Sequence, residues 1–239
     1  MRWDHPVRGL VPPIEFIDQA EQTGLIVPMT EILMRKARDR LATALKEFPD
    51  LYFSFNVTVG QLADPRFPDF LDRMFDEQSL PPRNVMLEMI ERDAVDARVS
   101  AGLTQLRLRG YRIAIDDFGT GQSSLSVLSK IECDRLKIDR EFVRAIDEDA
   151  TNRPVLDAII ELARRLNLPA IAEGVETQAQ RAYLSARGVA ALQGYLIAKP
   201  LPVSEFLIWL GDNHEWASSA DEAGRAGQLS RLSQADVAC

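Results

Sequence analysis

The sequence predicts an α/β fold in which parallel strands curl into a barrel of the (β/α)₈ type. From residue 51 onward, short apolar segments alternate with amphipathic segments of helical periodicity in six successive units. Repeated strand–helix units imply a parallel sheet. Each short segment ends in acidic, amide or basic side chains, and barrels carry their functional groups at the carboxyl ends of their strands. These polar ends favour a barrel over an open sheet.

The six expected strands are short and mostly apolar. In the first of them, Leu51, Phe53, Phe55 and Val57 alternate with polar positions, so one face is apolar and Asn56 lies on the other. The strands are predicted at residues 51–57, 85–90, 112–117, 135–138, 169–174 and 192–197.

Helices are expected between these strands, and several have recognisable ends. Asp93, Thr151 and Thr177 stand where N-cap residues belong, and Gly110 and Gly188 stand where C-cap glycines belong. The helices are predicted at about residues 67–77, 94–109, 122–131, 151–167, 177–187 and 203–210.

The two ends of the chain depart from the strand–helix alternation. Before residue 51 the pattern predicts helices only, at about 13–23 and 30–48, so about six of the eight strands of a closed barrel are present. After residue 211 the periodicity is weak and the composition is rich in Ala, Ser and Gly. We therefore expect one domain over residues 1–211 and a flexible tail over residues 212–239.

The composition excludes several functional classes. A net charge of −8 over 239 residues argues against a surface that binds duplex nucleic acid. No apolar run is long enough to span a membrane, and the amino terminus lacks the apolar core of a signal peptide. Cys133 and Cys239 form no spacing pattern, which is typical of a reducing cytosol. With two cysteines and two histidines, a metal site in this chain would have to use oxygen ligands.

The polar strand ends predict such a metal site. In a closed parallel sheet they meet at one rim, and carboxylates crowded there need cations between them. Mg²⁺ or Mn²⁺ prefers carboxylate and amide oxygens. Asn56, Glu88 and Asp116 can form part of one octahedral shell, and Asp117 can reach a second, adjacent cation.

Two adjacent cations are a recurrent device for hydrolysing phosphodiesters, because they activate water and neutralise the charge of the transition state. Lys137 would add a positive charge near the attacked phosphorus. Glu173 is placed to accept a proton. The glycine-punctuated loop at 118–125 can gather Glu91 and Asp117 around the metals.

Each of these residues also has a purely structural interpretation. Asp139 and Glu176 are each explained as helix N-caps, Lys137 as a solvated lysine and Asn56 as a turn residue. Their joint occurrence at successive strand ends favours the metal site. An enolase-like barrel also places acids on three consecutive strands, but the Asp116–Asp117 pair, the glycine loop and Glu173 fit it poorly.

Over about residues 2–210 the chain resembles the EAL domain, a metal-dependent phosphodiesterase module for cyclic di-GMP. The resemblance rests on many ordered motifs at compatible spacing. They include Asn-Val-Thr, Leu-Glu-Met-Ile-Glu, Asp-Asp-Phe-Gly-Thr-Gly, Leu-Lys-Ile-Asp and Ala-Glu-Gly-Val-Glu. The matching segments are residues 2–6, 13–17, 21–26, 56–58, 87–91, 116–121, 136–139, 172–176 and 193–201.

The resemblance implies a modified (β/α)₈ barrel with one antiparallel strand and a site for two Mg²⁺ or Mn²⁺ ions. It implies that the first metal is held by Asn56, Glu88 and Asp116, and the second by Asp117, with Glu176 supporting this set.

The resemblance also implies the catalytic and substrate-binding residues. Lys137 matches a lysine near the catalytic water, Glu173 an essential acid, and Glu91 the glutamate that anchors the mobile loop. Arg2 matches an arginine that contacts the ligand, and Gln193 a further position in the substrate site. The implied reaction is hydrolysis of cyclic di-GMP to linear pGpG in bacterial second-messenger signalling.

One departure from the family pattern lies at the front of the chain. The Glu-Ala-Leu motif is absent because the chain starts inside it, immediately before Arg2. Since that glutamate is a metal ligand in the family, we expect weak or no hydrolysis by this chain alone.

The alternative to an enzyme is a non-catalytic module that binds cyclic di-GMP or another protein. The resemblance further implies a homodimer, an upstream sensory or regulatory domain, and a cytoplasmic location that is compatible with membrane tethering of the full protein.

Overall fold

The fold is built on a curled, fully parallel sheet. The computed structural model describes residues 3–76, 80–90, 97–120, 128, 131–147 and 153–223. Six strands of this described part form one sheet in which each strand pairs with its neighbours in sequence. They are β3 (Phe53–Asn56), β4 (Val85–Ile90), β5 (Arg112–Phe118), β6 (Arg135–Ile138), β7 (Ala170–Ala172) and β8 (Ala191–Leu192).

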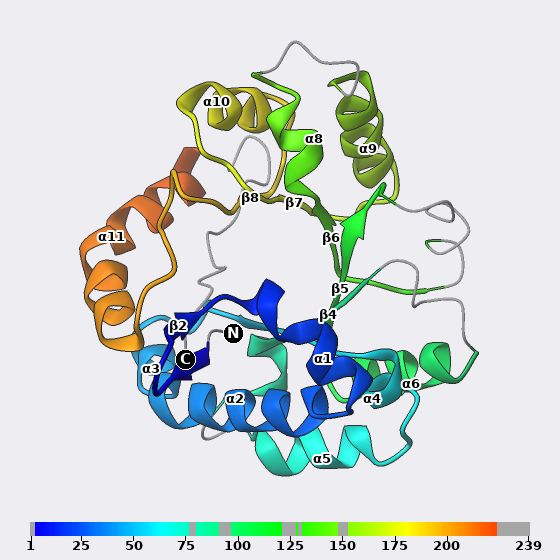
Figure 1. Ribbon diagram of the computed structural model, residues 1–239. Helices are drawn as coiled ribbons and strands as arrows, with labels where there is room; N and C mark the ends of the chain where they lie inside the picture. Colours follow the sequence, from blue (N-terminus) through cyan, green and yellow to red (C-terminus); the bar gives the residue numbers. More distant parts are fainter. Residues whose placement is uncertain are drawn as a thin grey trace.

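Helices surround the outer, convex side of this sheet, as Figure 1 shows. The 3₁₀ helices are η1 (Pro13–Glu15) and η2 (Pro82–Asn84). The α-helices are α1 (Ile17–Gln22), α2 (Ile26–Leu41), α3 (Ala44–Glu47), α4 (Val59–Leu62), α5 (Phe67–Met74), α6 (Ala97–Leu108), α8 (Arg140–Arg144), α9 (Arg153–Arg165), α10 (Gln178–Ala186) and α11 (Val203–Ala223). The curled sheet with its outer helices confirms the predicted (β/α)₈-type architecture with six strands.

The two faces of the sheet differ in chemistry because side chains alternate along each strand. The outer face joins the main apolar core under the helices, with residues such as Phe55, Leu87 and Ile115 fully or almost fully buried. The inner face carries a small separate apolar cluster, formed by Tyr52, Met86 and Ala114. The polar side chains of the candidate site lie on this inner face, beyond that cluster.

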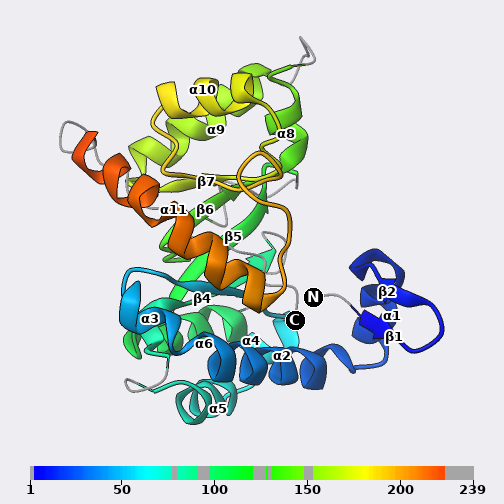
Figure 2. The same cartoon turned by 90° about the vertical axis from the view of Figure 1, so that its left-hand side faces the viewer.

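The amino-terminal segment corrects one prediction. Instead of helices alone, it begins with an antiparallel hairpin, β1 (Trp3–His5) and β2 (Gly9–Val11), which precedes η1 and α1. The hairpin and α1 project to one side of the parallel sheet (Figure 2). His5 Nδ1 accepts hydrogen bonds from the main-chain N–H groups of Val7 and Arg8, and these bonds close the turn. Such side-chain-to-main-chain bonding leaves no periodic signal in the sequence.

Strand and helix boundaries follow the predictions closely in the middle of the chain and less closely at its end. β4 and β6 have the predicted limits. β8 is much shorter than predicted, because Gln193 and Leu196 bond to the main chain of Val175 and Ile197 bonds back to Gly194. α11 continues to Ala223 instead of ending near residue 210. The flexibility expected for residues 212–239 therefore stays a prediction, and residues 224–239 lie outside the described part.

The helix-capping predictions can be checked where the structure describes the residues. Thr177 caps α10 in a reciprocal box with Gln180, as the sequence predicts. Gly110 and Gly188 have φ angles of 92° and 75°, the left-handed conformation that follows many helix ends. Asp93, Thr151 and most of the predicted helix at 122–131 lie outside the described residues. Among the described helices, none has the length and apolar content needed to cross a bilayer.

Gly102 in α6 lies directly against the main chain of α4. A Cβ atom at this position of α6 would stand 2.0 Å from the carbonyl oxygen of Leu62 in α4. Main-chain atoms cannot swing aside as a flexible side chain can. The contact therefore requires glycine, although glycine inside a helix costs conformational entropy.

We predict that Gly102→Ala lowers the free energy of unfolding by about 1–3 kcal/mol, because α4 and α6 must move apart. Urea denaturation monitored by circular dichroism measures this change. The matched control is Gly60→Ala in α4, where the nearest atom to a new Cβ is 3.8 Å away. The control should stay within ~1 kcal/mol of the wild type. Equal effects of both substitutions would contradict the packing argument.

Candidate active site

The candidate site lies where the parallel strands end, on the inner face of the sheet. Asn56 at the end of β3 is the register partner of Glu88 in β4. Asp116 in β5 pairs with Ile90, two positions beyond Glu88 toward the carboxyl end. Lys137 in β6 pairs with Ile171 of β7, and Glu173 follows directly after β7. The parallel register thus brings residues from five strands to one rim.

Lys137 lies at the centre of this group. Its Nζ is 2.7 Å from Glu88 Oε2, 3.0 Å from Asp116 Oδ2 and 2.5 Å from Glu173 Oε1. An ammonium group has three donors, so one lysine can serve all three carboxylates. We call these four side chains the carboxylate–lysine cluster.

The carboxylate–lysine cluster is withdrawn from solvent, so its charges must be stabilised by one another rather than by water. Glu88 and Lys137 are each 4% exposed. Burial raises the pKa of Glu88, the Lys137 ammonium opposes that rise, and the Asp116 carboxylate adds to it. Burial alone would lower the pKa of Lys137, but the Glu88, Glu173 and Asp116 carboxylates outweigh it and raise that pKa well above its usual value. Lys137 is therefore a permanent cation in this site.

The pKa of Glu173 lies near neutral pH, which suits this residue to proton transfer. Its main-chain N–H donates to the Ile138 carbonyl, which fixes the start of the segment after β7. Burial raises the pKa of Glu173 to about 7, assisted by the Asp116 and Glu88 charges and opposed by Lys137. A carboxyl group with this pKa can accept and release a proton near neutral pH.

An irregularity in β5 places two acids opposite one lysine. The pairing of β5 with β6 shifts between Ile115 and Phe118, so Asp116 and Asp117 together face Lys137. Asp117 has a φ angle of 54°, which is uncommon for a residue other than glycine. Asp116 Oδ1 accepts a hydrogen bond from the Asp117 N–H at 3.0 Å. This bulge lets both consecutive aspartates turn toward the rim.

Asp117 lies close to a further acid, Asp139. Burial raises the pKa of Asp117, and the charges of Asp116 and Asp139 together with a hydrogen bond to Asp139 raise it further. Asp139 also caps α8 by accepting a hydrogen bond from the Glu141 N–H. Asp139 therefore has the structural role expected from the sequence and, in addition, a place beside the candidate site.

The other predicted site residues have more varied surroundings. Asn56 is exposed and stands beside Glu88 at the strand ends. Gln193 is partly buried, and its main chain bonds to Ala172 and Val175. Glu176 is exposed, and its N–H donates to Gln180 Oε1 in the cap of α10. Arg2, Glu91 and residues 121–125 of the predicted loop lie outside the described residues.

Two residues of the site had no functional role in the prediction. The Ser54 side chain, two positions before Asn56 on the same face of β3, shares a hydrogen bond with Glu88. Asp139, two positions after Lys137, contacts Asp117. Strand periodicity is the signal that could have found both, since residues two apart share a face.

The donor chemistry of this rim fits a divalent cation. Glu88, Asp116, Asp117 and Glu173 offer hard oxygen ligands, and three of these acids have pKa values raised in part by their acidic neighbours. A cation would relieve that repulsion. Within the described ranges, no three acidic, His or Cys side chains stand in a metal-binding arrangement. In this structure the ammonium of Lys137 is the counter-charge.

The chain matches the sequence model of the family described as EAL domain over residues 1–200. Among curated proteins, it is 41% identical over 214 residues to the probable cyclic di-GMP phosphodiesterase PdeN of Escherichia coli, covering 88% of this chain and 41% of PdeN. It is 38% identical over 210 residues to the bifunctional diguanylate cyclase/cyclic di-GMP phosphodiesterase MucR of Pseudomonas aeruginosa, covering 87% of this chain and 31% of MucR.

A solved structure extends this likeness to three dimensions. The PaMucR phosphodiesterase in complex with c-di-GMP superimposes with a TM-score of 0.80 at 36% identity, covering 86% of this chain and 84% of that one. The chain spans less than half the length of PdeN and of MucR. The match over residues 1–200 and the identities to these relatives show that this chain belongs to the EAL domain family.

Proposed function

We propose that this domain binds cyclic di-GMP and, with Mg²⁺ or Mn²⁺, hydrolyses one of its phosphodiesters to give linear pGpG. The observation that carries the proposal is the carboxylate–lysine cluster, in which Lys137 holds Glu88, Asp116 and Glu173 together at the strand ends. The names of PdeN and MucR and the ligand in the PaMucR structure support the choice of substrate.

In this proposal Asn56, Glu88, Asp116 and Asp117 hold the divalent cations, with Glu176 supporting them. When bound, the cations activate the attacking water and neutralise charge that builds up on the phosphate. Lys137 keeps the carboxylates in place and contributes a fixed positive charge to the same rim. Glu173, with a pKa of about 7, accepts a proton from the attacking water. Arg2 and Gln193 contact the substrate, and Glu91 anchors the loop at 118–125.

The wider setting of the proposal is a cytoplasmic signalling protein. Because the chain spans 41% of PdeN and 31% of MucR, we propose that the domain works within a longer protein, under an upstream sensory or regulatory domain. A homodimer is part of the same proposal. The homodimer can be tested on the full protein by size-exclusion chromatography with light scattering.

The function is tested on the full protein, because weak or no hydrolysis is expected of this chain alone, and the test separates binding from hydrolysis. Calcium permits cyclic di-GMP binding without turnover, so titration calorimetry with Ca²⁺ measures affinity, while pGpG formation with Mn²⁺ measures hydrolysis. We predict that Glu173→Gln lowers the hydrolysis rate by about 10²–10⁴-fold, since a general base is lost. Binding in Ca²⁺ should change only a few-fold.

The matched control is Glu161→Gln in α9, which removes an exposed carboxylate that pairs with Arg164 and Arg165 on the surface. Both activities of this variant should equal those of the wild type. Binding with no pGpG at all would favour the non-catalytic module, and absence of both binding and hydrolysis would refute the proposal.

The raised pKa of Glu173 also predicts a pH dependence of stability in the absence of metal. Between its ordinary pKa of 4.5 and the folded value of about 7, the folded state binds more protons than the unfolded state. Stability must therefore fall as pH rises through this window, by up to about 1.4 kcal/mol per pH unit. Urea unfolding in EDTA from pH 5 to pH 8 measures this slope.

Glu173→Gln should flatten the slope between pH 5 and pH 7, because the titrating group is gone. Glu176→Gln serves as the control, since it removes an exposed carboxylate from the same segment. Identical slopes for Glu173→Gln and the wild type would show that Glu173 is already charged at pH 5.

A further inference from the structure

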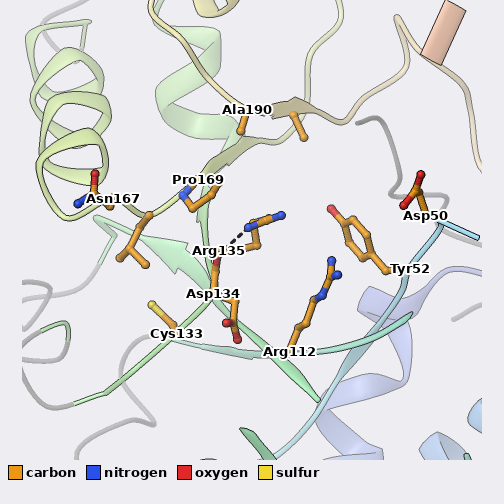
Figure 3. A pocket seen from close by; sticks show the side chains of 11 residues that line it. Asp50, Tyr52, Arg112, Cys133, Asp134, Arg135, Asn167, Pro169 and Ala190 are labelled. Atoms are coloured by element: carbon orange, nitrogen blue, oxygen red, sulfur yellow. Dashed lines mark hydrogen bonds between the residues drawn. The ribbon is translucent and has the colours of Figure 1, made fainter. Parts of the chain in front are cut away.

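β7, the strand that leads to Glu173, is held at its start by both neighbouring strands. The Leu136 N–H donates to the Pro169 carbonyl at 3.2 Å, and the Ala190 N–H donates to the Ala170 carbonyl at 2.9 Å. Figure 3 shows this amino-terminal end of the sheet, with Pro169 close to Ala190. Parallel pairing with β6 and β8 therefore fixes β7 itself. The direction of the Glu173 side chain then depends on the turn that follows the strand.

The chain passes from β7 to α10 over residues 173–177, which we call the Glu173 turn. Gly174 in this turn has a φ angle of 67°, a left-handed conformation that glycine adopts without strain. A Cβ atom on Gly174 would stand 2.4 Å from the Cβ of Arg140, so α8 packs directly on the turn. The turn must therefore follow one main-chain path, although glycine by itself permits many.

Val175 in the middle of the Glu173 turn is supported by a second turn. Its N–H donates to the Gln193 carbonyl at 2.9 Å, and its carbonyl accepts from the Leu196 N–H at 3.0 Å. Both partners lie after the end of β8, where the Ile197 N–H bonds back to the Gly194 carbonyl at 3.0 Å. One turn thus rests on another. A regular element has to support the Glu173 turn beyond Val175.

Gln180 in the first turn of α10 provides that support. Its Oε1 accepts hydrogen bonds from the Glu176 N–H at 2.7 Å and from the Thr177 N–H at 3.1 Å. Its Nε2 donates to Asp147 Oδ2 at 2.9 Å, and the side chain is only 3% exposed. Because an amide nitrogen cannot accept a hydrogen bond, the Asp147 carboxylate fixes which end of the Gln180 amide faces the turn.

Asp147 connects this support to the lysine of the site. It accepts a further hydrogen bond from the Thr177 hydroxyl at 3.2 Å, and its N–H donates to the Arg144 carbonyl at 3.1 Å, in the last turn of α8. At its other end, α8 is capped by Asp139, two residues after Lys137. The Glu173 turn is thus tied to the Lys137 strand by a second route, through α8 and Gln180.

A second helix of the same protein shows that capping alone does not require all of these bonds. Gln61 in α4 forms the same kind of reciprocal cap with the residue three positions before it. There the residue before the cap, Val57, donates to the Glu88 carbonyl of β4 at 2.9 Å instead, and Gln61 Nε2 has no hydrogen-bond partner among the described residues. The bond from Gln180 to the Glu176 N–H is therefore additional to the cap.

We propose that Gln180 is a positioning residue for the reaction: it fixes the Glu173 turn so that the Glu173 carboxylate stays against Lys137 and Glu176 stays at the rim. The inference rests on the proposed hydrolysis and extends it to a side chain that touches no reacting group. A catalytic acid works only if its oxygen is held at the reacting atoms. In this site a buried amide three residues inside the next helix supplies that constraint.

The test compares kcat for pGpG formation by the full protein at saturating Mn²⁺ with the affinity for cyclic di-GMP in Ca²⁺. Gln180→Met keeps the length of the side chain but cannot accept the two N–H groups. We expect kcat to fall at least about tenfold, since misplacing a catalytic group by about 1 Å can cost still more. The affinity in Ca²⁺ should change only a few-fold, because a positioning role acts on the reaction rather than on binding.

A paired substitution provides the rescue. Gln180→Glu together with Asp147→Asn exchanges the acid and the amide, so Glu accepts from the two N–H groups and Asn donates to Glu. This variant should regain kcat to within a few-fold of the wild type. The matched control is Tyr183→Phe in the same helix, which removes a 2.9 Å hydrogen bond to Asp157 in α9 and should leave both kcat and affinity unchanged.

Crystal structures of the chain without metal test the geometry independently of hydrolysis. We expect the Glu173 carboxylate to leave Lys137 Nζ in Gln180→Met and to return in the paired variant. Gln180→Asn, which is one carbon shorter, carries the same expectations if circular dichroism shows that Gln180→Met does not fold. If the wild type forms no pGpG, the proposed hydrolysis alone fails, and these structures decide the role of Gln180. Glu173 unmoved in the unrescued variant, wild-type kcat in that variant, or an equal loss of kcat and affinity would each overturn the inference.

Discussion

The contact on which the site depends is the ion cluster formed by Lys137 with Glu88, Asp116 and Glu173. Removing three carboxylates from solvent costs several kcal/mol for each charge unless a counter-charge replaces the lost water. The ammonium of Lys137 supplies one positive charge within 3.0 Å of each of them. Burial raises the pKa values of Glu88 and Glu173, and because one cation does not balance three anions, the neighbouring carboxylates raise them further. The same imbalance makes the rim receptive to divalent cations.

The parallel register explains how residues so distant in sequence reach one lysine. Each strand delivers one polar residue at its carboxyl end, and the bulge in β5 delivers two, Asp116 and Asp117. The outer faces of the same strands are buried under helices, so the strands cannot slip without exposing their apolar side chains. The core therefore fixes the geometry of the site.

Much of this arrangement was predictable from the sequence, for identifiable reasons. β4 and β6 are short apolar runs between clear breaks, and their limits were predicted correctly. The convergence of Glu88, Asp116, Lys137 and Glu173 followed from strand ends alone. The β1–β2 hairpin was missed because its turn is closed by His5 rather than by a periodic pattern. Contacts from Ser54 and Asp139 were not predicted: strand periodicity places each residue on the same face as a predicted site residue, but that pattern alone does not show which side chains touch.

The most direct test of the metal-binding rim is a crystal structure of the chain grown with Mn²⁺ and measured at a wavelength that gives anomalous scattering from manganese. The cluster described here predicts an anomalous peak at the strand ends, with oxygens of Glu88 and Asp116 within coordination distance, and Lys137 still bonded to Glu173. A structure with no peak at this rim at saturating Mn²⁺, or with its peak elsewhere on the molecule, would contradict it.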